Sequence, residues 1–132
     1  MDTAYMGITL NLQKQYNKVN ELQELTKQMT ECLQRNDMFS FRMLVRMRGK
    51  VMIELGSLDI TQEEMLKTLT KDEETRARKA LTLEVDATQL ENIDLRRMNE
   101  IYSNIKRNLK NTIYYDKAIS LKIGGDSSFY KQ

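Results

Sequence analysis

The chain has 132 residues, of which 40% are hydrophobic and 30% charged, a size and composition typical of one soluble domain. It contains no His, Pro or Trp, only 5 Gly and a single Cys. Without His there can be no His-based acid–base pair or His metal ligand, and one Cys cannot form an internal disulfide or a Cys-based zinc site. We therefore expect a protein that is not an enzyme and that uses no cofactor and no metal.

The charge is nearly balanced, with 21 Lys and Arg against 19 Asp and Glu and a formal net charge of +2. This balance lacks the large positive field of a dedicated nucleic-acid binder. No hydrophobic run is longer than three residues, which excludes a transmembrane helix or the apolar centre of a signal peptide. We expect a cytoplasmic protein without membrane insertion, and Cys32 is interpreted as a small apolar residue on a partly buried helix face.

One apolar stripe predicts the first helix, over residues 7–35. Its members recur at steps of three, four or seven, as expected for one face of an α-helix. They are Ile8, Leu12, Tyr16, Val19, Leu22, Met29 and Leu33, with Leu25 and Cys32 alongside. Thr26 occupies a seam position where an apolar residue is expected, so the stripe resembles an imperfect coiled coil.

A break at Asn36–Asp37 separates this helix from a second one. Asp37 can accept hydrogen bonds from the free amides of the next first turn, so we expect a tight antiparallel hairpin. Gly56 is predicted to end the second helix, because glycine readily takes the left-handed conformation of a C-terminal cap.

The second half of the chain contains two further start signals. Thr61–Glu64 has the pattern of a capping box and predicts a helix to about residue 84 with a weakly anchored middle. Asp86–Gln89 is either another cap or a solvent-facing part of one long helix. The last strong apolar pattern predicts a helix over 87–118, and whether 61–118 forms one helix or two stays open.

These elements predict an all-α fold, an antiparallel helical hairpin plus a long C-terminal helix. The helices form a bundle of three to four members or a coiled-coil-like assembly. Residues 1–120 are expected to be a single helical domain. Residues 121–132, with two Gly followed by Asp and two Ser, are expected to be a flexible tail.

The second helix has a basic outer face, formed by Arg42, Arg46, Arg48 and Lys50. Such a face can contact phosphate. Pairing with the acidic segment around Glu63, Glu64 and 72–74 accounts for it equally well, and no helix-turn-helix corner or interleaved aromatic set supports nucleic-acid binding.

Nine methionines are a high count for this length. Met29, Met52 and Met98 sit in the apolar stripes and are predicted to be core. Four others lie off the stripes and are candidates for exposure and partner contact: Met38, Met43, Met47 and Met65.

The order and texture of the helices resemble the small flagellar type III export chaperones of the FlgN/FliT kind. The likeness covers nearly the whole chain: a long amphipathic first helix, the Asn36–Asp37 break, an Arg-rich second helix and a charged middle segment follow in order. A long helix then carries the Met98 to Leu109 stripe, and the chain ends in the polar Ser127–Tyr130 segment.

The resemblance implies a cytoplasmic chaperone that binds a C-terminal helical segment of a flagellar hook–filament junction or filament-cap protein. The chaperone would deliver this client to the type III export apparatus, with no nucleic acid involved and with a homodimer as one possible state. By this analogy, and because small bundles often leave a groove that accepts another helix, we expect the client to contact Met98, Ile101, Tyr102, Ile105, Leu109 and Ile113.

Two other functions compete with this hypothesis. A non-flagellar helical adaptor or coiled-coil dimerisation protein predicts self-association through the first helix and no affinity for export substrates. A nucleic-acid-binding regulator predicts salt-sensitive DNA binding that depends on Arg42 and Arg46.

Overall fold

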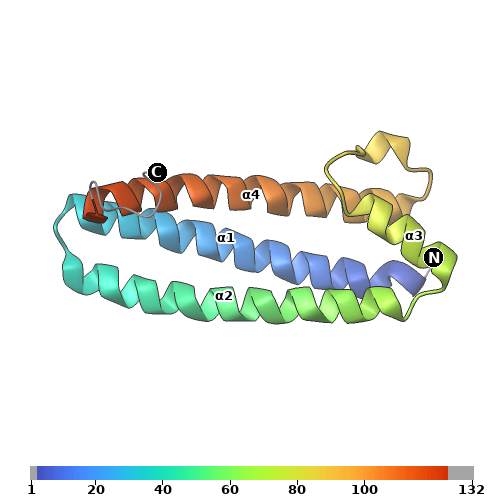
Figure 1. Cartoon of the computed structure of the whole chain (residues 1–132), viewed down its shortest axis with the longest axis horizontal. Coiled ribbons are helices and arrows are strands. Elements are labelled where there is room, and N and C mark those ends of the chain that lie inside the picture. Colours follow the sequence, from blue (N-terminus) through green and yellow to red (C-terminus); the bar gives the residue numbers. More distant parts are fainter. Residues whose placement is uncertain (1–2, 125–132) are drawn as a thin grey trace.

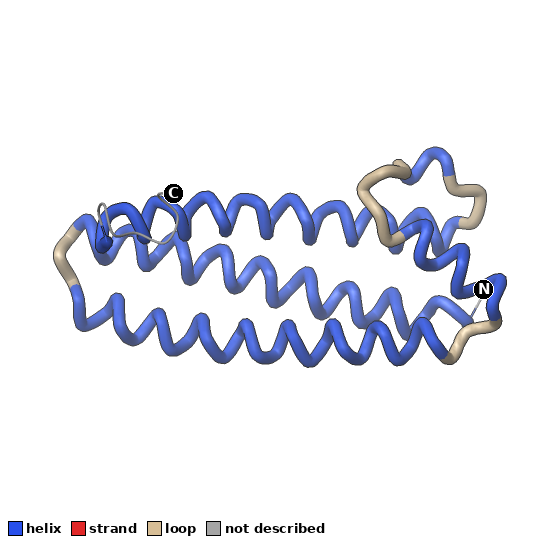
Figure 2. Tube along the Cα trace, in the orientation of Figure 1, coloured by secondary structure: helices blue, strands red, loops and turns tan. Residues whose placement is uncertain are grey.

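The computed structural model describes residues 3–124, and every regular element within that range is helical (Figures 1 and 2). Most of the molecule consists of the three long helices α1 (Met6–Gln34), α2 (Met38–Lys67) and α4 (Ile93–Gly124). The shorter helix α3 spans Lys71–Ala80, and the 3-10 turns η1 and η2 span Thr3–Tyr5 and Ala87–Gln89. The predicted all-α helical bundle is confirmed.

Helix α1 lies between α2 and α4 and packs against both of them along its length (Figure 1). The α1–α2 hairpin is antiparallel, as predicted. Helix α4 runs in the same direction as α1, because α2 carries the chain back to the end of the bundle where α1 begins. Little direct contact joins α2 to α4.

Two residues make the hairpin turn, and both the break and its cap are confirmed. Asn36 has a φ of 58°, a left-handed conformation that Asn tolerates better than most residues. Its backbone N–H donates to the Leu33 carbonyl, and the Asp37 N–H donates to the Cys32 carbonyl, which together form the Schellman ending of α1. The Asp37 carboxylate then accepts from the Ser40 N–H at 3.0 Å and caps α2.

The predicted end of α2 at Gly56 is wrong, because the helix continues to Lys67. The predicted capping box at Thr61 is also wrong, since Thr61 lies inside α2 and donates its hydroxyl to the Ser57 carbonyl. The capping box that forms is nine residues further on, where Thr70 and Glu73 satisfy each other's backbone amides at the start of α3.

The stretch 61–118 is therefore neither one helix nor two. It comprises the last turns of α2, then α3, η2 and most of α4. Asp86 does act as a cap, for η2, while the Asn92 side chain accepts from the Asp94 and Leu95 amides and starts α4. Helix α4 begins six residues later and ends six residues later than predicted, so residues 121–124 are its last turn. The remaining tail, 125–132, lies outside the described residues.

The core consists of two clusters along α1. One joins the beginning of α1 to the end of α2, to α3 and to the first half of α4, and it includes Leu12, Leu66 and Met98. The other fills the hairpin end and includes Met29 and Cys32, both predicted to be buried. Met52, also predicted to be core, is 54% exposed. Leu55 and Leu109 pack against both clusters and connect them.

Candidate helix-binding groove

A groove of about 530 Å³ lies between α2 and α4. Helix α1 forms its floor, and α3 with the residue that follows it forms one end. The groove exists because α1 separates its two neighbours. Its lining residues are Leu12, Gln15, Val19, Leu55, Gly56, Asp59, Gln62, Glu63, Leu66, Arg78, Leu81, Tyr102, Ile105, Lys106 and Leu109.

The floor of the groove is apolar except at one point. Leu12 and Val19 are fully buried core residues that lie one turn before and one turn after Gln15. The Gln15 amide nitrogen donates to Asn11 Oδ1 and to Gln62 Oε1, both at 2.6 Å. This amide ladder joins α1 to α2 and satisfies the polar groups that would otherwise be costly to bury beneath the groove.

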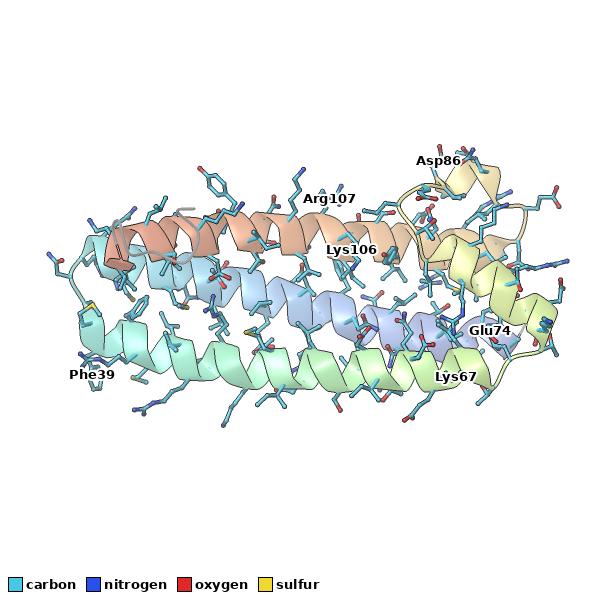
Figure 3. The ribbon with its side chains drawn as sticks, viewed as in Figure 1. Phe39, Lys67, Glu74, Asp86, Lys106 and Arg107 are labelled. Atoms are coloured by element: carbon cyan, nitrogen blue, oxygen red, sulfur yellow. The ribbon has the colours of Figure 1, made fainter. Side chains whose placement is uncertain are left out.

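The two walls carry opposite charges. On α2, Asp59 and Glu63 follow Gly56 along the flank that lines the groove. On α4, Lys106 lies over the ring of Tyr102, with its Nζ 5.3 Å from the ring centroid, a cation–π distance. Lys106 and Arg107 are adjacent in sequence but differ in direction: Lys106 lies toward the neighbouring helices and Arg107 points away from the bundle (Figure 3).

Ion pairs close both ends of the groove. At one end, Arg78 of α3 donates to Glu63 at 2.7 Å and to Glu74 at 2.8 Å, which fixes α3 against α2. This guanidinium holds the pKa of Glu63 below its usual range and keeps the carboxylate charged. At the other end Arg48 pairs with Asp116 across the gap between α2 and α4. Arg48 is seven residues from Leu55 and Asp116 is seven from Leu109, so the pair lies two turns beyond the lining residues.

The structure divides the six residues predicted to contact a client. Tyr102, Ile105 and Leu109 line the groove. Ile113 is 49% exposed and follows Leu109 by one turn on α4. Met98 and Ile101 lie in or against the core cluster and are absent from the groove lining, and Ile105 is itself only 4% exposed.

Most of the groove was missed by sequence reasoning. The α2 wall was not recognised as one helix, because the second helix was predicted to end at Gly56 and a new one to start at Thr61–Glu64. The signal that could have found it is the continuation of the apolar spacing from Leu55 through Leu58 and Gln62 to Leu66, at steps of three and four.

The basic face of α2 is not paired as the sequence suggested. Within the described residues, Arg48 pairs with Asp116 of α4, while the acidic segment pairs with Arg76 and Arg78 of α3. Residues 3–124 contain no group of three or more Cys, Asp or Glu placed to hold a metal ion. None of the helices in that range is both long enough and apolar enough to cross a membrane.

Comparisons with protein-family models, with curated proteins and with solved structures found no significant match to this chain.

Proposed function

We propose that this chain is an export chaperone that holds a C-terminal helical segment of a client protein in the groove between α2 and α4. The clients are a flagellar hook–filament junction or filament-cap protein, delivered to the type III export apparatus. The single observation that carries the proposal is the groove itself, an apolar channel bounded by three helices in the position where a further bundle helix would pack.

The dimensions of the groove suit a helix. Its α2 wall is lined from Leu55 to Leu66, a rise of about 16 Å and three helical turns. A client helix of that length would place apolar residues, at steps of three and four, against the partly exposed lining residues Leu55, Tyr102 and Leu109.

The charges of the walls favour one chemistry for the client. Asp59 and Glu63 would face a flank rich in Lys or Arg, and Lys106 would face a flank that carries Asp or Glu. The resemblance to FlgN/FliT chaperones supplies the flagellar identity of the client, which the groove alone does not specify.

The test is a binding titration with C-terminal fragments of the hook–filament junction and filament-cap proteins from the same genome. We expect a stoichiometric complex with one fragment. Lys106→Glu should weaken it about tenfold, which corresponds to ~1.4 kcal/mol. Arg107→Glu makes the same charge change on the outward side of α4 and should leave affinity unchanged.

Both variants change exposed residues and should keep the fold, which circular dichroism at 222 nm checks. An equal loss of affinity in both would indicate a general charge effect and overturn the groove as the binding site. No complex with any fragment would overturn the flagellar function.

A second candidate function is a non-flagellar helical adaptor. The sequence hypothesis placed its self-association on the first helix, but the seam of α1 packs against α2 and α4 within one chain. An adaptor of this fold would therefore use an outer face of the bundle.

A further inference from the structure

The outer side of α2 near the hairpin carries two parallel rows of exposed side chains. Phe39, Met43 and Met47 form an apolar row, and Phe39 is 73% exposed. Arg42, Arg46 and Lys50 form a basic row beside it. Each row advances by four residues, so its members lie on successive turns of one helix face.

The basic row has no acidic partner within the described residues. From Met38 to Ile53 the helix contains no acidic residue at all, and the first one, Glu54, is paired with Lys18 at 2.6 Å. Like charges one turn apart destabilise an isolated helix. The basic row therefore lowers the stability of the single chain, and no ion pair within the described residues offsets this loss.

The apolar row has an acidic border on its other side. A hollow of about 460 Å³ lies between α1 and α2, next to Met43 and Met47. Glu24 and Glu31 of α1 line its far edge, together with Arg35, whose charge is paired with Asp37 at 3.7 Å. Both glutamates are exposed. Across this face the order is thus a basic row, an apolar row with a hollow, and an acidic pair.

We infer that a second copy of this chain docks on this face, with the two α2 helices parallel. A two-fold axis parallel to the helices places the faces of the two copies opposite each other with the order of their rows reversed. It leaves every residue at the same position along the bundle axis. The basic row of one copy then meets the acidic pair of the other, twice, and the two apolar rows meet between them. A two-fold axis across the helices would instead place Arg against Arg.

The levels of the charges agree with this symmetry. The Lys18–Glu54 pair sets the register of α1 against α2, so Glu24 lies level with residue 48 and Glu31 level with residue 41. Arg42 is one residue from the level of Glu31, and Arg46 and Lys50 are two residues to either side of the level of Glu24.

The same acidic pair argues against a polyanion as the occupant. A membrane or nucleic-acid backbone placed on Phe39 and Met43 would bring its negative charge against Glu24 and Glu31 as well as against the basic row. The groove between α2 and α4 lies on a different flank of α2, so this inference does not depend on the proposed client.

Light scattering and sedimentation over a range of concentrations test the inference on the full chain. The mass of the wild type should rise from 15.6 kDa toward twice that value. The double variants Arg42→Glu/Arg46→Glu and Glu24→Lys/Glu31→Lys should each remain monomeric, because each faces like charges across the two-fold axis. An equimolar mixture of the two should dimerise again, since the substituted positions 42 and 46 of one variant then face the substituted positions 31 and 24 of the other with opposite charge.

Three results would overturn the inference. The first is a wild type that stays monomeric at every concentration. The second is that the two double variants dimerise as well as the wild type. The third is that their mixture shows no rescue while both remain helical by circular dichroism. A polyanion site would show itself differently. The monomeric wild type would bind phosphatidylglycerol vesicles or duplex DNA, and Glu24→Lys/Glu31→Lys would bind them more tightly.

Discussion

Replacing Gly56 by Ala should stabilise the chain and at the same time weaken client binding. Gly56 lies inside α2, eleven residues before its end. The backbone there is helical and needs no left-handed conformation, so glycine only adds the cost of its larger loss of conformational entropy on folding. A Cβ built at this position meets no atom within 4 Å, so the added methyl group creates no clash.

The size of the gain follows from helix propensity. Glycine is about 0.8–1.0 kcal/mol less favourable than alanine in a helix interior. For a domain of 132 residues, a gain of that size raises the midpoint of thermal unfolding by about 3–5 °C. Thermal unfolding followed at 222 nm, together with urea unfolding of the same sample, measures both quantities.

Gly49 provides the matched control. It lies two turns earlier on α2, a Cβ there also meets nothing within 4 Å, and it is absent from the groove lining. Gly49→Ala should give the same gain in stability and unchanged client affinity, whereas Gly56→Ala narrows the wall that a client helix approaches. The reasoning fails if neither variant is more stable than the wild type, or if both lose client affinity equally.

Four further substitutions test the packing and capping of the bundle. Asn99→Asp should destabilise the fold by about 1–3 kcal/mol in urea unfolding, because the buried Asn99 amide donates to the Ala80, Thr82 and Val85 carbonyls and a carboxylate cannot. Met98→Ala should cost about 2–5 kcal/mol, since Met98 is fully buried, while the exposed Met52→Ala should change stability by less than about 0.5 kcal/mol. Asp37→Asn should remove a contribution to the free energy of unfolding that depends on pH. The hydrogen bonds from Ser40 hold the pKa of Asp37 below its ordinary 3.8 in the folded chain. The stabilisation is therefore fully present above pH 3.8 and is lost as the pH falls through the folded-state pKa. A stability difference between wild type and Asp37→Asn that stays constant from pH 7 to pH 2 would contradict the last expectation.

The hairpin was predictable because its signals are local. The stripe of α1 repeats over eight turns, and the Asn36–Asp37 pair supplies a left-handed residue and an N-cap in adjacent positions. Nothing distant in the sequence competes with these two signals.

The end of α2 was not predictable in the same way, because a glycine can either end a helix or lie within one. A glycine ends a helix only where the contacts that follow favour a left-handed turn. Gly56 is followed by Met65 and Leu66, which pack in the core and keep α2 helical against it. The pattern Thr-x-x-Glu likewise occurs at Thr61 and at Thr70, and only the second one follows a helix end. Choosing between them requires the length of the facing helix α1.

The candidate site was only partly predictable for a related reason. The stripe on α4 gives the correct helix, but it includes both the side that packs on α1, with Met98 and Ile105, and the side that faces the groove, with Tyr102 and Leu109. Spacing of three and four residues does not separate these adjacent sides. The separation depends on where α2 lies.

The central place of α1 also sets an order of assembly. During synthesis α1 and α2 emerge first, and a turn of a few residues lets them pair early, whereas α4 docks only after α3 and the connection that follows it. Until then the second apolar flank of α1 has no neighbour, and the channel has one wall. The proposed client segment would thus have a complete binding surface only once the last helix is made, so its capture would be restricted to fully synthesised chains.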